Sequence, residues 1–269
     1  MRHSPAAMFS DCRKRFAHKR KEDQELRISS CTTVGTPAVI IFNWDDTLCC
    51  TSSLVLEGEQ QRAILPDFVV ESSVVATCVG RLPPRLLRQM DDIVCRLVAE
   101  ALRIGRTFIV TNSSVEWVWK TARAFLPGLL PLLDRVAVVS ARDSYETSFP
   151  KEHGRWKDMA FLEIARQVDP SCRGDLLVIG NSDLEMHAAD VAGARLKDWR
   201  LKVIKLRQKP SVQDLLVQQR IVLDNLFVFK ETDKSVTVTL ERSEASGNCP
   251  ADNVGSDGTM AERPGILSL

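Results

Sequence analysis

Ala38-Val39-Ile40-Ile41-Phe42-Asn43-Trp44-Asp45-Asp46-Thr47-Leu48 is the most informative segment of this chain. A strand buried on both faces of a parallel sheet is apolar at every position, and residues 38–42 have this pattern. In open α/β sheets, ligands bind beyond the carboxyl ends of the strands. The stretch therefore predicts a buried parallel strand and places residues 43–48 where a functional site is expected.

The alternation of strand and helix patterns continues along the chain. Short runs rich in valine, isoleucine and leucine predict further buried strands at 107–110, 136–139, 176–179 and 201–206. Amphipathic patterns predict helices at 84–104, 115–126, 156–168, 184–192 and 212–226. Parallel strands that alternate with helices form βαβ units. We therefore expect an α/β fold, a doubly wound Rossmann-like three-layer sandwich with a five-stranded, mostly parallel sheet.

Composition divides the chain into one domain and two tails. Residues 36–230 hold these elements, and within 231–241 the alternation at 235–240 predicts an additional edge strand. Residues 242–269 are rich in serine, glycine, asparagine, aspartate and proline, which predicts a disordered tail. Residues 1–35 predict a flexible basic leader. Such a leader serves as a nuclear import signal, an organelle presequence, a docking arm or a solvated tail, and the sequence leaves these roles open.

Charge and composition argue against several classes of protein. The net charge of +1 gives no general attraction to nucleic acid or membranes, and no apolar stretch reaches the ~20 residues that span a bilayer. The eight cysteines form no Cys-x-x-Cys pair and the chain has four histidines, so neither a zinc site nor a disulfide framework is indicated. The first residues lack the apolar core of a secretory signal. We expect an intracellular protein, cytoplasmic unless its basic leader directs it to the nucleus or an organelle.

Residues 37–207 resemble the haloacid dehalogenase-like (HAD) phosphatase superfamily, whose first motif is an apolar strand followed by Asp-x-Asp-x-Thr. In that family the first Asp attacks phosphorus, and here its position holds Asn43. The resemblance assigns the general acid and base to Asp45, whose backbone carbonyl binds Mg²⁺ in the family, and it matches Thr47. A carboxamide is a poor nucleophile without an anionic form at neutral pH. The motif thus indicates the fold and argues against the reaction.

The second motif of the family is a hydroxyl residue that binds phosphate together with the next backbone N–H. Thr111 and Asn112 match these positions at the end of a predicted strand. Ser113 and Glu116 have the spacing of a capping box, which predicts a helix start whose N–H groups face an anion. Some eukaryotic members are closer still, and their motifs correspond to Thr111-Asn112, Trp117-Val118 and Ser140-Ala141-Arg142-Asp143.

The third and fourth motifs concern phosphate neutralisation and metal binding. The resemblance assigns the phosphate-neutralising lysine to Lys157, with Lys151 as the alternative. The fourth motif, Gly-Asp-x-x-x-Asp in the family, corresponds to Gly180-Asn181-Ser182-Asp183-Leu184-Glu185. The first metal-binding acid is therefore the amide Asn181, and Glu185 matches the second acid, although Ser182 and Glu185 also have capping-box spacing. Asp183 lies within the motif as a substitute ligand.

Two amides in place of carboxylates predict that Mg²⁺ binds weakly or is absent, because this ion prefers anionic oxygens. Loss of a nucleophile lowers the rate by roughly 10⁴–10⁶. The same replacements remove repulsion between the site and a phosphate dianion, so the site can bind phosphate even where catalysis is lost. We expect a catalytically impaired HAD-like pseudophosphatase that binds a phosphorylated ligand or a phosphoprotein without turnover, or that keeps the fold as a scaffold.

Other functions remain open at this point. An active Mg²⁺-dependent phosphohydrolase would have to use carboxylates in unusual positions, namely Asp45, Asp46, Asp183 and Glu185. A nucleotide-binding Rossmann protein is disfavoured because no Gly-x-Gly-x-x-Gly follows the first strand. The short connections leave little or no room for a cap domain, and in the family an open cleft of this kind suits macromolecular ligands. No membrane partner and no specific nucleic-acid partner is indicated, and the oligomeric state stays open.

Overall fold

The computed structural model of the chain describes residues 36–55, 83–169, 171–241 and 267–268. From Pro37 onward these residues belong to one compact unit. The predicted leader 1–35, the segment 56–82 and all but two residues of the predicted tail 242–269 lie outside the described part of the chain.

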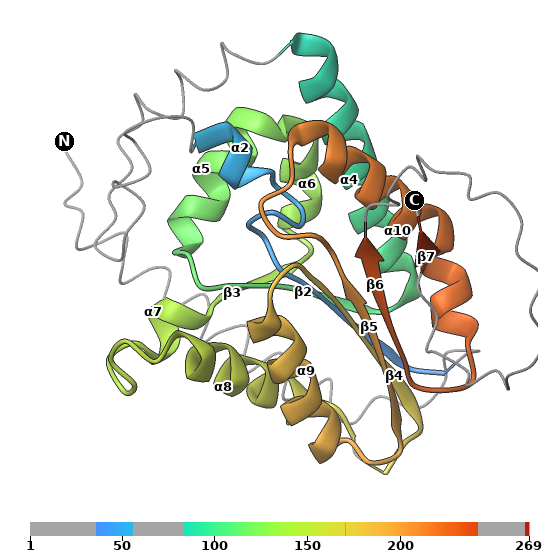
Figure 1. Cartoon of the computed structure of the whole chain (residues 1–269). Helices are drawn as coiled ribbons and strands as arrows, with labels where there is room; N and C mark the ends of the chain where they lie inside the picture. Colours follow the sequence, from blue (N-terminus) through green and yellow to red (C-terminus); the bar gives the residue numbers. More distant parts are fainter. Residues whose placement is uncertain (1–35, 56–82, 170, 242–266, 269) are drawn as a thin grey trace, which may run out of the picture. The chain divides into compact units, whose positions relative to one another are not determined.

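A parallel sheet forms the centre of this unit (Figure 1). Its strands are β1 (Ala38–Phe42), β2 (Arg106–Thr111), β3 (Ala137–Ser140), β4 (Gly174–Gly180), β5 (Trp199–Lys205) and β6 (Val236–Glu241). They lie in the order β3-β2-β1-β4-β5-β6, and every neighbouring pair is parallel. The two-residue strand β7 (Leu267–Ser268) pairs in parallel with the end of β6.

The expectation of a five-stranded sheet is wrong by one strand, because the predicted edge strand is a full member of the parallel sheet. β6 pairs with β5 through Val236, Thr237, Val238 and Thr239. Its alternating pattern buries Val238 and Leu240 in the core shared with β1 and β5. This apolar face explains why the segment continues the sheet.

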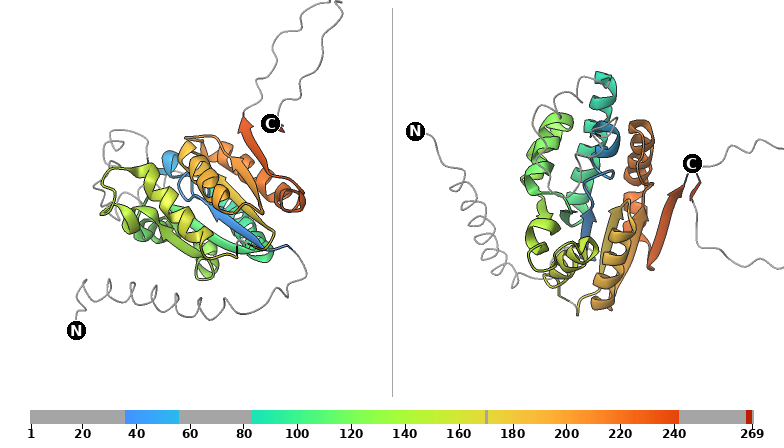
Figure 2. Two further views of the ribbon diagram at one scale, coloured as in Figure 1. Left: turned by 90° about the horizontal axis from the view of Figure 1, so that it is seen from below. Right: turned by 60° about the vertical axis from the view of Figure 1, so that its left-hand side comes forward.

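Helices cover both faces of the sheet, which gives the three layers that the sequence predicts (Figures 1 and 2). One face carries α4 (Pro84–Ile104), α5 (Val115–Phe125), η3 (Pro127–Leu129), α6 (Leu130–Leu133) and α10 (Val212–Glu231). The other carries α7 (Ala141–Tyr145), α8 (His153–Ala165) and α9 (Asp183–Arg195). β1 lies between the two cores: Ile40 and Phe42 pack into the first and Val39 and Ile41 into the second.

The connections near the carboxyl edge of the sheet are short where the structure describes them. α2 (Thr51–Val55) follows the loop after β1, and α7 with the turn up to residue 152 joins β3 to α8. This second connection is too short for a cap domain. Among the described helices, none is both long and apolar enough to cross a membrane.

Candidate functional site

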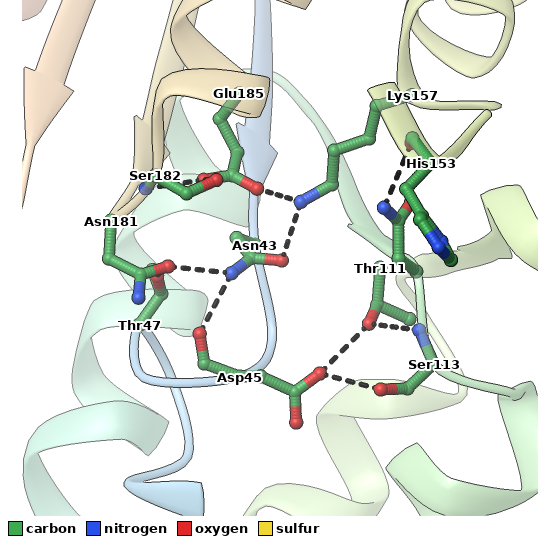
Figure 3. A network of polar contacts seen from close by, with 11 residues as sticks. Asn43, Asp45, Thr47, Thr111, Ser113, His153, Lys157, Asn181, Ser182 and Glu185 are labelled. Carbon is green, nitrogen blue, oxygen red and sulfur yellow. Dashed lines mark hydrogen bonds and ion pairs between the residues drawn. The ribbon is translucent and has the colours of Figure 1, made fainter. Parts of the chain in front are cut away.

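Polar side chains from several elements meet at the carboxyl edge of the sheet (Figure 3). The loop after β1 supplies Asn43, Asp45 and Thr47, and the end of β2 supplies Thr111. Lys157 comes from α8, while Asn181 and Glu185 come from the end of β4 and the start of α9. The parallel register brings these segments together, because Phe42 pairs with both Ile109 and Ile179. The structure therefore joins seven of the sequence-predicted residues in one network.

The Asn43 amide is the centre of this network. Its Nδ2 donates to the backbone oxygen of Asp45 at 2.8 Å and to Oδ1 of Asn181 at 2.9 Å. Its Oδ1 accepts from Nζ of Lys157 at 3.0 Å. If the amide were flipped, its oxygen would face the oxygens of Asp45 and Asn181, and its nitrogen would face the ammonium of Lys157. These neighbours therefore determine the orientation of the Asn43 amide. Asn43 is buried and has both halves of its amide satisfied.

The turn after Asn43 is held by contacts with residues outside this network. Asp46 has a left-handed backbone with φ of 54°, which an aspartate tolerates better than most residues. Its carboxylate accepts from the backbone N–H and the hydroxyl of Ser52 at the start of α2. Burial raises the pKa of Asp46, and the hydrogen bonds from Ser52 oppose the rise. Gln219 of α10 donates to the backbone oxygens of Thr47 and Leu48 and holds the turn from a second element.

Asp45 points toward the end of β2 and the start of α5. Its Oδ2 accepts from the hydroxyls of Thr111 at 3.1 Å and Ser113 at 2.8 Å. Its Oδ1 accepts from the indole N–H of Trp117 at 2.8 Å. All three of these donors are uncharged, and together they hold the carboxylate in one orientation. Figure 3 shows the two hydroxyl donors, Thr111 and Ser113.

Lys157 and Glu185 form a buried ion pair beside Asn43. Lys157 is 3% exposed and Glu185 is 2% exposed. Burial lowers the pKa of the Lys157 ammonium to about 7, and the negative charge of Asp45 opposes the shift. Glu185 also accepts from the backbone N–H of Ser182 at 2.7 Å, as the capping-box spacing predicts. Gly180, at the end of β4, leaves space for the Glu185 side chain, because a Cβ at Gly180 would lie 2.6 Å from Cγ of Glu185.

Three residues that the sequence places in or near the site lie outside this network. The side chain of Asp183 is 81% exposed and pairs with Lys205. Asn112 donates from Nδ2 to the backbone oxygen of His153 at 3.0 Å, while its Oδ1 is buried without a hydrogen-bond partner. Lys151 is exposed in the turn before α8, with φ of 64°. Of the two candidate lysines, the structure places Lys157 in the network.

The predicted capping box of Ser113 and Glu116 is wrong, because the cap lies one residue later. Ser114 caps α5 by accepting from the N–H of Trp117 at 3.1 Å. The Ser113 hydroxyl is thereby free to bind Asp45. Sequence reasoning therefore missed the contacts of Ser113 and Trp117 with Asp45. The resemblance to the eukaryotic branch drew attention to Trp117 without giving it a role.

The oxygens at the centre of the network do not suit a divalent cation. The backbone oxygen of Asp45 and Oδ1 of Asn181 are uncharged, and both already accept from the Asn43 amide. Mg²⁺ usually takes at least one carboxylate. Within the described residues, no group of three or more histidine, cysteine, aspartate or glutamate side chains could hold a metal ion.

Comparisons with protein families, with curated proteins and with solved structures find no match to this chain.

Proposed function

We propose that this chain is a HAD-like pseudophosphatase that binds the phosphoryl group of a ligand or protein partner without turnover. The observation that carries the proposal is the bonding of Asn43. Its Nδ2 connects the Asp45 backbone oxygen with Asn181, and its Oδ1 contacts Lys157. In the HAD superfamily, the corresponding oxygens surround Mg²⁺. An amide N–H group thus takes over the connection that a metal would make there.

The absence of turnover follows from the chemistry of this amide. Asn43 has no anionic form to attack phosphorus, and its oxygen is already bound to Lys157. The carboxylates that could replace it are engaged elsewhere: Asp46 caps α2, Asp183 pairs with Lys205, and Glu185 pairs with Lys157. No observation favours an active phosphohydrolase built on these side chains.

Retention of phosphoryl binding rests on the charges that remain. Two unit charges at 4 Å interact by roughly 4 kcal/mol at an effective dielectric near 20. The amides at 43 and 181 avoid repulsion of that order toward a dianion, while Lys157 contributes a buried cation when protonated. The connection between β3 and α8 has no cap domain, which agrees with access for a phosphoprotein, the partner class that we propose.

A thermal-shift measurement in EDTA tests the proposal. At ten times its dissociation constant, inorganic phosphate would stabilise the protein by about 1.4 kcal/mol, which raises Tm by about 3–5 °C in a domain of this size. Chloride at equal ionic strength should leave Tm unchanged. The double variant Lys157→Met, Glu185→Gln removes the cation without leaving a buried carboxylate unpaired, and it should abolish the shift.

The matched control is Lys205→Met, which removes a partly exposed lysine that pairs with Asp183 on the same edge of the sheet. It should keep the phosphate response. The proposal is contradicted if phosphate does not raise the Tm of the natural chain. It is also contradicted if phosphate raises the Tm of the double variant as much as that of the natural chain.

A further inference from the structure

The Asp45 carboxylate lies on a set of donors that suits an oxyanion. Two hydroxyls, of Thr111 and Ser113, meet at its Oδ2, and the Trp117 indole meets its Oδ1. We propose that this carboxylate is an internal anion that occupies the donors, and that a phosphoryl ligand binds by displacing it. This inference rests on the phosphoryl-binding function proposed above and concerns the regulation of the same site.

The donors are held in place by the ends of β2 and α5. Thr111 is fully buried, and its hydroxyl accepts from the backbone N–H of Ser113 at 3.0 Å. The Ser114 cap orients the first turn of α5 and with it Trp117. The first N–H of α5, that of Val115, is already used by Asp143. An incoming anion would therefore meet side-chain donors of fixed geometry rather than a bare helix end.

The occupant can leave more easily than the donors can move. Asp45 lies on the loop after β1 and is half-buried, so its carboxylate can rotate into water, where its charge is well solvated. The Thr111 hydroxyl, which is buried, would then lack this acceptor, and that is unfavourable for a buried group. A tetrahedral dianion corrects this, because one edge presents two oxygens as the carboxylate does.

Competition of this kind lowers the apparent affinity for the ligand. When only a fraction of the protein is in the state that can bind, the apparent affinity equals the intrinsic affinity multiplied by that fraction. Removing the carboxylate should therefore strengthen anion binding. The effect should be specific to Asp45, whereas a nearby carboxylate outside the donor set acts only through long-range charge. Asp183 provides this comparison, since it lies on the same edge and is exposed.

The test follows the indole N–H signals of the ¹⁵N-labelled full chain by NMR during titration with sulfate, which stays dianionic. Trp117→Phe assigns the relevant signal. We expect the Trp117 signal to shift, while Trp44 and Trp156, which donate to Thr121 and to the Phe149 backbone, stay in place. Sulfate should bind about tenfold more tightly to Asp45→Asn and Asp45→Ala. Asp183→Asn should change the affinity less than about threefold, because exposed charges are screened.

The outcomes separate this inference from the proposed function. If sulfate binds to the natural chain but the Trp117 signal does not move, the anion lies elsewhere and the displacement is wrong, while anion binding stands. An equal gain of affinity in Asp45→Asn and Asp183→Asn also overturns it, since charge alone would then explain the effect. If neither the natural chain nor any variant binds sulfate, the proposed function itself fails.

Discussion

Asn43 and Asn181 make a contact that two carboxylates could not make without a cation. The Nδ2 of Asn43 lies 2.9 Å from Oδ1 of Asn181, and the hydroxyl of Thr47 donates to the same oxygen at 3.3 Å. Aspartates at both positions would bring two negative oxygens together here. The amide pair therefore makes this contact without a cation, and both amides contribute to it.

Lys157 is the residue that gives the site a pH dependence. Burial lowers the pKa of its ammonium to about 7, so the cation is present below this pH and is lost above it. Sulfate does not titrate in this range, so its affinity reports the protein alone. We expect sulfate binding to weaken about tenfold between pH 6 and pH 8, because the protonated fraction falls by that factor. Isothermal titration calorimetry at constant ionic strength measures it.

The control for this pH dependence is again the double variant Lys157→Met, Glu185→Gln, which should show no gain of sulfate binding at the lower pH. The charged groups beside Lys157 are Asp45 and Glu185, and the double variant removes the second of them together with the lysine. Equal affinity of the natural chain at both values of pH would show that Lys157 keeps its proton or does not contact the anion.

At the scale of secondary structure, the elements that have strong patterns were predictable. The structure begins and ends β1 and α4 at the predicted residues, Ala38–Phe42 and Pro84–Ile104. β1 is apolar at every position, and α4 carries a regular buried stripe before Gly105. The short elements α2, α6 and α7 were not predicted, because four or five residues are too few to show a period.

The sequence predicted the location of the site better than it predicted the hydrogen bonds within it. The order of motifs along the chain led to Asn43, Asn181 and Lys157, since carboxyl ends of parallel strands share one edge. The partners of Asp45 were not predictable, because they depend on which of two adjacent serines caps α5. A shift of one residue sends the Ser113 hydroxyl to Asp45 and leaves the cap to Ser114.

Gly105 provides a test of how closely α4 and β2 approach the start of β1. Its backbone is extended, so space rather than conformation requires glycine: a Cβ there would lie 2.2 Å from the backbone oxygen of Ala38. We expect Gly105→Ala to destabilise the protein by about 1–3 kcal/mol, measured by urea unfolding. The control is Gly154→Ala in the first turn of α8, whose Cβ would be 3.4 Å from Leu184. It should be neutral or stabilising by up to ~1 kcal/mol. Equal effects of the two changes would contradict this packing.

At the scale of the whole sheet, the site lies where the strand order reverses. From β1 the chain moves to β2 and β3 on one side, and β4, β5 and β6 follow on the other. Connections after β1 and β4 therefore diverge to opposite faces, which is where open α/β sheets bind ligands. Asn43 and Asn181 follow these two adjacent strands, so the topology places them next to each other.

The proposed pseudophosphatase function predicts that the double reversion Asn43→Asp, Asn181→Asp should give the site a metal-binding pair of carboxylates. In EDTA, the two facing carboxylates should destabilise the variant by about 2–4 kcal/mol through their repulsion. Mg²⁺ at 100 times its dissociation constant should then return about 2.7 kcal/mol, while the natural chain should show no response. The reverted chain should also hydrolyse a generic aryl phosphate with Mg²⁺, and adding Asp45→Asn should abolish this activity.

Each single reversion is the matched control, because one carboxylate beside one amide gives an incomplete site and a smaller Mg²⁺ response. The decisive comparison is with the natural chain. If it hydrolyses the aryl phosphate with Mg²⁺ as fast as the reverted chain, and Asp45→Asn abolishes that activity, the pseudophosphatase proposal is wrong and another carboxylate binds the metal. If the natural chain is inactive and the reverted chain is active, the loss of turnover lies in these two amides, because the rest of the network is the same in both proteins.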